Sequence, residues 1–243
     1  MELSQANITT DTNAYNMTST QATYTDANQQ ILVDLLVKQF INLVRRFIVN
    51  GSETFNIRPM DPLQLEQFQI EIPSDSIWLF MEIEKGNVTG LGGFVVNTSH
   101  LQLSSLTLDL DVSLPQIHVK ADHYKLSGII LNSIPLYGDG EAEFFVSEFG
   151  VSARVHLKRS DDGRSIVIGW LEDAQFSLPS IKSDLNGVVG GGGVVNAIVS
   201  QGLVTHARRL RGALARLAAL ALPQILNPLL QQVNTWSYVE PWL

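Results

Sequence analysis

The sequence predicts an α+β protein in which a long, highly curved antiparallel sheet lies between two long helices in chain order. Residues 61–178 alternate mostly between apolar and polar side chains, as strands with one buried face do. Apolar stripes at helical spacing occupy residues 26–51 and 194–222, on either side of this region. Glycines inside the strands, such as Gly128, mark bends or close backbone approaches. Repeated bends let a sheet curl around an apolar object.

The first predicted helix spans residues 26–51. Asp26 and Gln29 have capping-box spacing, and Asn50-Gly51 is a stop signal. The preceding residues 1–25 are rich in Thr, Asn, Gln and Ser, so we expect a disordered tail. No linker or internal repeat interrupts the remainder, and residues 26–243 are therefore expected to form a single domain.

The central strands are predicted from strict alternation. Leucines occupy every second position from Leu106 to Leu110, and residues 151–157 alternate in the same way. Asp161-Asp162-Gly163 is a hairpin signal ahead of the apolar residues 166–170. Consecutive strands joined by short turns indicate an antiparallel meander.

The glycine-rich residues 187–193 are expected to form a hinge before the second long helix. Pro223 is expected to break that helix, with a short helix over residues 225–233 after it. Four arginines lie away from the apolar stripe. A solvated helix face is the favoured interpretation, and contact with anionic lipid or a partner is the alternative. The four are Arg208, Arg209, Arg211 and Arg216.

Composition excludes some classes of function. The 243 residues carry a net charge of −8, which disfavours nucleic acid as a partner. The absence of cysteine removes disulfides, thiol nucleophiles and thiolate metal sites. No hydrophobic signal segment opens the chain, so we expect a mature form. We expect no uncharged run to reach the roughly 18 apolar residues of a membrane span, so no transmembrane segment is predicted.

Glycosylation sequons favour a secreted, extracellular glycoprotein. The pattern Asn-X-Ser/Thr occurs, with no proline at X, at Asn7, Asn16, Asn50, Asn87 and Asn97.

Residues for catalysis are sparse. There is no Gly-X-Ser-X-Gly nucleophile motif. Asp109 and Asp111 share a strand face, but they alternate with leucines and are expected to face solvent. His118 and His156 have the polar parity of their strands, so exposure is expected there as well. We therefore predict no enzyme, no cofactor and no metal site.

Three segments carry a family resemblance. They are Asp61-Pro62-Leu63, Val88-Thr89-Gly90-Leu91, and Tyr124-X-X-X-Gly128 followed by Pro135-Leu136-X-Gly138-X-Gly140. In order and spacing they resemble the arthropod takeout and juvenile-hormone-binding family and its relatives, the mite group 7 allergens, over about residues 28–233. The resemblance implies a tubular lipid-binding fold, in which a strongly curved sheet wraps a long helix around an elongated apolar tunnel. It also implies a secreted carrier of lipids or terpenoids and not an enzyme.

One departure from the family pattern bears on the ligand. Takeout and hormone-binding members usually have a cysteine pair near the N-terminal helix, and this chain has none. It therefore leans toward the group 7 branch, which puts juvenile hormone itself in doubt.

Two hypotheses follow. The first is a carrier that takes up one elongated apolar ligand such as a fatty acid or terpenoid. The second is a surface-interaction protein with a filled core, which binds a protein receptor or a microbial or anionic lipid surface through residues 208–216. Ligand contacts for the carrier are expected from the first helix, a sheet wall and the last helix. They are Leu36, Phe40, Val44, Phe47, Leu106, Leu108, Leu110, Leu210, Leu214 and Leu217.

Overall fold

The computed structural model describes residues 31, 35, 37–53, 57–73 and 76–243. The chain divides into two compact units, residues 1–42 and residues 43–243. The predicted tail, residues 1–25, lies outside the described residues, as do Leu36, Asn7 and Asn16. Helical conformation covers residues 37–50, and Gly51 follows with a left-handed φ of 66°. The predicted stop at Asn50-Gly51 is therefore confirmed.

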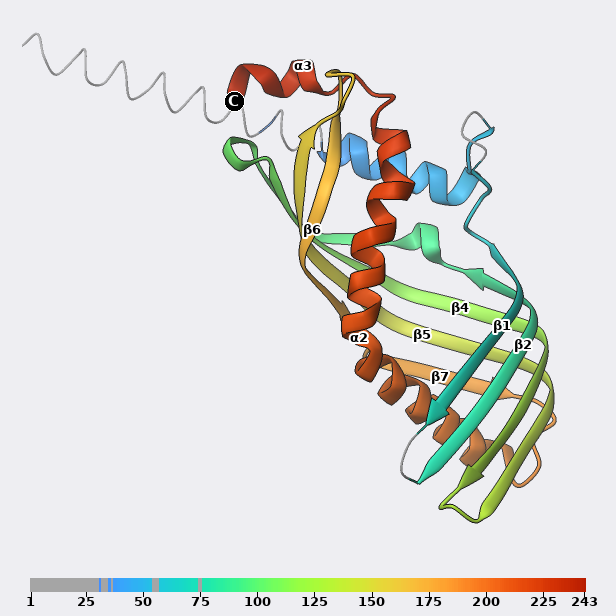
Figure 1. Cartoon of the computed structure of the whole chain (residues 1–243). Helices are drawn as coiled ribbons and strands as arrows, with labels where there is room; N and C mark the ends of the chain where they lie inside the picture. The colour runs from blue at the N-terminus through green and yellow to red at the C-terminus, as the bar shows by residue number, and fades with distance from the viewer. Residues whose placement is uncertain (1–30, 32–34, 36, 54–56, 74–75) are drawn as a thin grey trace, which may run out of the picture. The chain divides into compact units, whose positions relative to one another are not determined.

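The described residues form a seven-stranded antiparallel sheet in the larger unit (Figure 1). The main path runs β1-β2-β4-β5-β6, while β3 pairs with β4 and β7 pairs with β5. The alternation was expected to end near Leu178, so β7 was not predicted. The strands are β1 (Leu63–Pro73), β2 (Ile77–Thr89), β3 (Val95–Gln102), β4 (Thr107–Ile130), β5 (Ile134–Arg159), β6 (Ile166–Ser177) and β7 (Ser180–Leu185).

Charged residues in left-handed conformation interrupt three of the long strands. Lys85 in β2, Glu148 in β5 and Asp173 in β6 have φ angles of 53°, 55° and 52°. In β5 the buried positions are even before Glu148, as at Phe144, and odd after it, as at Val155. At each such residue the alternation shifts by one position, so the apolar side chains before and after it stay on one face of the sheet.

The glycines around residue 138 permit close contacts. A Cβ added at Gly138 would lie 2.6 Å from the hydroxyl oxygen of Tyr124, and one added at Gly128 would lie 2.7 Å from the side chain of Leu79. Both glycines therefore leave room for a buried side chain of a neighbouring strand. The prediction of close approach in this segment is confirmed.

The long C-terminal helix α2 (Gly192–Leu230) crosses from β7 to β6 in Figure 1. The prediction that Pro223 ends this helix is wrong, because α2 continues through Pro223 and Pro228. Asn227 accounts for the continuation. Its side chain accepts a hydrogen bond from the main-chain N–H of Ile168 (2.8 Å) and donates to the Ile168 carbonyl (2.9 Å). These two bonds to β6 hold the segment between the prolines, and they offset the main-chain bond that a proline removes.

Apolar side chains are buried at both ends of α2. The N-terminal half of the helix contributes Val195 and Val199 to a core that also contains Leu79, Tyr124 and Phe144. At the other end of the helix, further apolar side chains are buried. They include Val167 and Ile168 of β6, Leu229, Leu230 and Val239, the last from the short helix α3 (Trp236–Val239).

Two of the family-marker segments meet beside the first strand. The Asp61 carboxylate accepts hydrogen bonds from the main-chain N–H groups of Gly90 (3.0 Å) and Gly92 (2.7 Å). Arg45 donates to the carbonyls of Gly92 (3.3 Å) and Phe94 (2.8 Å), and its guanidinium lies 4.7 Å from the centre of the Phe94 ring. These contacts fasten residues 43–50 to the sheet through the turn η2 (Leu91–Gly93).

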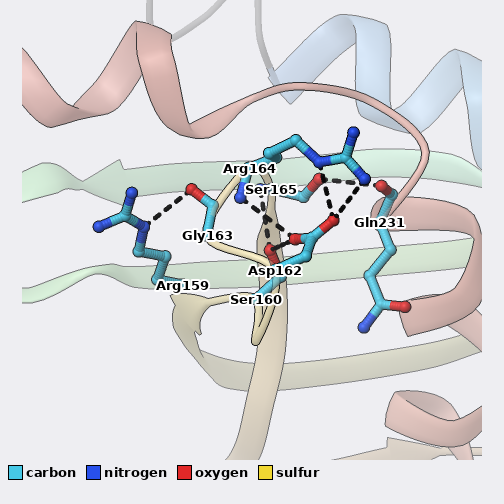
Figure 2. A network of polar contacts seen from close by, with 7 residues as sticks. All are labelled: Arg159, Ser160, Asp162, Gly163, Arg164, Ser165 and Gln231. Carbon is cyan, nitrogen blue, oxygen red and sulfur yellow. Dashed lines mark hydrogen bonds and ion pairs between the residues drawn. The ribbon is translucent and has the colours of Figure 1, made fainter.

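The predicted hairpin at residues 161–163 joins β5 and β6 (Figure 2). The Asp162 carboxylate accepts hydrogen bonds from the Ser160 hydroxyl (2.5 Å) and from the main-chain and side-chain N–H groups of Arg164 (3.2 and 3.0 Å). The buried Ser165 hydroxyl donates to the carbonyl of Gln231 (3.0 Å), which ties this hairpin to the end of α2. The Ser160 hydrogen bond is the largest cause that lowers the pKa of Asp162, to about 2.

Candidate ligand-binding surface

The apolar face of the sheet is only half-buried midway along β4 and β5. Val112 pairs with Val151, and Leu114 pairs with Phe149, whose ring stacks on Phe176 of β6 with centroids 5.9 Å apart. All five side chains are half-buried, whereas Leu108 and Val155, which pair with each other further along the same face, are buried. We call Val112, Leu114, Phe149, Val151 and Phe176 the sheet strip.

The opposite face of the same strands is charged. Arg154 donates two hydrogen bonds to the Asp109 carboxylate, at 2.7 and 3.2 Å, and this pair lowers the pKa of Asp109. The prediction that Asp109 lies on a solvent-facing side is therefore confirmed. His156 bonds Glu172 at 2.7 Å and stacks on Trp170 on this side. The contrast between the two faces identifies the sheet strip as the apolar side.

The apolar stripe of α2 continues beyond the core. Val195, Val199 and Leu203 line it where the helix is packed into the sheet, and Leu210, Leu214 and Leu217 follow at the same spacing. The exposed fractions of these three leucines are 41%, 41% and 62%. We call Leu210, Leu214 and Leu217 the helix strip.

The other predicted ligand residues have varied positions. Leu106 precedes β4 with a left-handed φ of 49°, so the predicted strand begins one residue too early. Leu108 is buried and Leu110 is half-buried. The side chains of Phe40, Val44 and Phe47 are half-buried on the helix of residues 37–50, with Phe40 in the smaller unit.

The sheet strip contains residues that the ligand prediction left out. Val151 had been assigned to an alternating strand, and Val112 and Leu114 continue the alternation of Leu106 to Leu110. Parity therefore placed these residues on the correct face. Phe149 and Phe176 carried no comparable signal, because Glu148 and Asp173 shift the alternation next to them.

Two open hollows lie on the surface of the described residues. One of about 390 Å³ is lined by Pro223, Gln224, Asn227, Pro228 and Gln231 on α2 and just after it. The other, of about 350 Å³, lies over Asp109, Asp111 and Arg154 and also contacts Leu110. Both are open and have walls of mixed polar and apolar character, so neither is the apolar tunnel that the resemblance implies, and that tunnel stays a prediction.

The outer face of the sheet carries further titratable groups. His118 contacts Glu143 at 3.2 Å and stacks on Phe145, and His123 lies between Glu84 and Asp139 at 3.5 and 3.0 Å. Across the part of the chain that the structure describes, no three His, Asp or Glu side chains gather as a metal site requires.

The sequons that are described differ in their contacts. Asn50, Asn87 and Asn97 are all exposed. The Asn97 amide nitrogen donates to Asp111 (2.8 Å), and its oxygen accepts from the Ser113 hydroxyl (3.1 Å). The side chain of Asn97 is thus held by β4.

The expectation that no segment is apolar enough to span a membrane is wrong for α2. By length and composition alone this helix qualifies, with a mean hydropathy of 1.4 over 18 residues, of which 6% are buried. Val199 and Leu229 are nevertheless buried toward its two ends, so the sheet holds α2 at both ends.

Comparisons with known proteins agree with this architecture. The sequence profile described as haemolymph juvenile hormone binding protein matches residues 22–240. The crystal structure of takeout 1 from Epiphyas postvittana is similar with a TM-score of 0.55 and 18% identity, over 79% of this chain and 91% of that chain. This likeness confirms the predicted α+β fold of a curved antiparallel sheet with a long C-terminal helix.

A crystal structure of lipopolysaccharide binding protein is a more remote match. Its TM-score is 0.33 at 12% identity, over 66% of this chain and 35% of that chain. No curated protein matches the sequence.

Proposed function

Because the chain belongs to the haemolymph juvenile hormone binding protein family, we propose that it is a carrier of one elongated hydrophobic molecule, such as a fatty acid or terpenoid. One observation supports this most directly. The apolar stripe of α2 runs from the buried Val199 onto the exposed helix strip, while the sheet strip is also left half-buried. Two apolar surfaces in one unit thus remain incompletely covered.

Binding would be driven by removal of apolar surface from water, which contributes about 25 cal/mol per Å². The sheet strip consists of Val, Leu and Phe side chains, and the helix strip consists of leucines. Such walls offer few polar partners, so shape and length of the ligand would govern selectivity more than hydrogen bonding. Carriage of this kind needs no catalytic group or cofactor.

We also propose that the protein acts outside the cell as a glycoprotein. The sequons at Asn50 and Asn87 support this, because both side chains are exposed. Secretion from a eukaryotic cell followed by glycosidase treatment and a gel-mobility measurement tests it.

The carrier proposal is tested with natively purified protein. Extraction with organic solvent followed by mass spectrometry is expected to release an elongated lipid, and a fluorescent fatty-acid analogue is expected to bind saturably and to be displaced by it. Protein without extractable lipid and without saturable probe binding would favour the filled-core hypothesis.

A further inference from the structure

The middle of α2 carries a concentration of positive charge that the carrier proposal does not use. Residues 208–220, which we call the arginine segment, contain four of the 16 basic residues of the chain. The entire helix α2 has no Asp or Glu. The other 12 basic residues and all 24 acidic residues lie elsewhere in the sequence. A cationic helix therefore belongs to a chain that is otherwise strongly acidic.

Most of these arginines have no partner. Arg208, Arg211 and Arg216 are exposed and make no hydrogen bond or ion pair with any residue that the structure describes. Arg209 is also exposed and donates to the carbonyl of Pro73 at 3.3 Å. Unpaired guanidinium groups on an acidic protein are available to an external anion.

The most exposed leucines of α2 lie on the same side of the helix as two of these arginines. Arg209, Arg216 and Leu220 are spaced by seven and four residues, which places them on one stripe, and Leu217 lies beside it. Leu217 and Leu220 are 62% and 68% exposed. Leu217 is also the last residue of the helix strip, and the other two members, Leu210 and Leu214, are less exposed, so the exposure of the strip is greatest at this end.

We propose that the arginine segment docks on an anionic phospholipid surface. Leu217 and Leu220 insert at the boundary between headgroups and acyl chains, and Arg209 and Arg216, on the same side of α2, extend to the phosphates and carboxylates. Because Val199 and Leu229 hold both ends of α2 in the sheet, the segment lies along the surface and does not cross it.

Charge favours an anionic membrane over other partners for the arginine segment. An anionic membrane attracts the arginine segment and repels the acidic remainder of the chain, so the two effects together orient the protein. A second copy that docked through the same segment would bring like charges together and be repelled. The inference does not depend on the carrier proposal, since a filled core would leave the arginine segment unchanged.

The test uses the full chain and two kinds of vesicle, phosphatidylcholine alone and a two-to-one mixture of phosphatidylcholine and phosphatidylserine. Co-sedimentation is expected with the mixed vesicles only, and it should weaken as salt is raised. The double variant R209Q/R216Q is expected to bind about fivefold more weakly for each arginine removed. The variant L217Q/L220Q is expected to lose binding at all salt concentrations.

A matched control removes two exposed basic residues outside α2, as R58Q and K182Q, and should bind like the unmodified chain. Circular dichroism melting of each variant shows that the fold is kept. Equal losses in the control and in the α2 variant would overturn the proposal, because net charge alone would then explain binding. Binding to neutral vesicles alone, or to neither vesicle, would overturn it too.

Discussion

The hydroxyl of Tyr124 donates a 2.8 Å hydrogen bond to the main-chain carbonyl of Asn186, a residue 62 positions further along the chain. Tyr124 is fully buried, and its ring passes over Gly138. Burial is the largest cause that raises the pKa of its phenol, to about 12, and the negative charge of Asp139 adds to it. The pair joins β4 to the turn that follows β7, at the centre of the core.

Replacement of Gly138 by Ala is expected to destabilise the protein by about 2–4 kcal/mol, because the new Cβ would lie 2.6 Å from the Tyr124 hydroxyl oxygen. Urea unfolding followed by circular dichroism measures this. Gly212 on α2 is the control, since a Cβ there meets nothing within 4 Å and alanine favours a helix. A G138A variant as stable as the unmodified chain would contradict the proposed role of this contact.

Asp61, like Tyr124, joins segments that are distant in the sequence. Substitution by Ala is expected to cost about 1–3 kcal/mol for each main-chain N–H left without a partner, and Gly90 and Gly92 both lose theirs. The exposed Asp161 gives a matched control, D161A, with little expected change. Denaturant titration compares the two. Similar midpoints for D61A and D161A would show that η2 is held by other contacts.

The architecture could largely be predicted because its signals are local. Alternation over residues 151–157 and the stop at Asn50-Gly51 depend on nearest neighbours. Pro223 was misjudged because the bonds that keep its segment helical come from β6, through Asn227. No local sequence pattern predicts a hydrogen-bond partner that lies so far away in the chain.

The candidate site was predicted less well for a related reason. Leu108 and Leu110 are both leucines on the same face of β4, but only Leu108 is buried. Sequence parity selects a face and does not show where along that face packing stops. The left-handed Glu148 also shifts the alternation beside Phe149, so the alternation did not predict which face Phe149 occupies.

The hairpin network in Figure 2 predicts a dependence of stability on pH. The pKa of Asp162 in the folded state, about 2, lies below its ordinary value of 3.8, so the charged form stabilises the fold. That contribution is fully present above about pH 4 and is lost as the pH falls toward 2. The difference in melting temperature between the unmodified chain and D162N should therefore be largest near neutral pH and should vanish near pH 2. D161N is the control, and a difference that stays constant with pH would contradict this assignment.

Glycosylation should distinguish two sequons on consecutive strands, β2 and β3. Both Asn87 and Asn97 are exposed, but only the Asn97 amide is hydrogen-bonded on both its oxygen and its nitrogen, to Ser113 and Asp111. In protein secreted from eukaryotic cells, N87Q is expected to increase gel mobility by one glycan, whereas N97Q should leave it unchanged. If only N97Q removed a glycan, modification would precede the formation of the β3–β4 pair.

The sheet strip makes the sharpest prediction about ligand binding. Replacement of Val151 by Trp should fill space above the apolar face and weaken binding of a fluorescent fatty-acid analogue by at least about tenfold. The melting temperature should change little, because the side chain of Val151 is only half-buried. Ser152 is the matched control, since it pairs with Asp111 on the polar side of the same strand, and S152W should bind the probe normally. If V151W and S152W bound the probe equally well, the ligand would lie elsewhere. If V151W lost stability and binding together, the sheet strip would instead be a packed core.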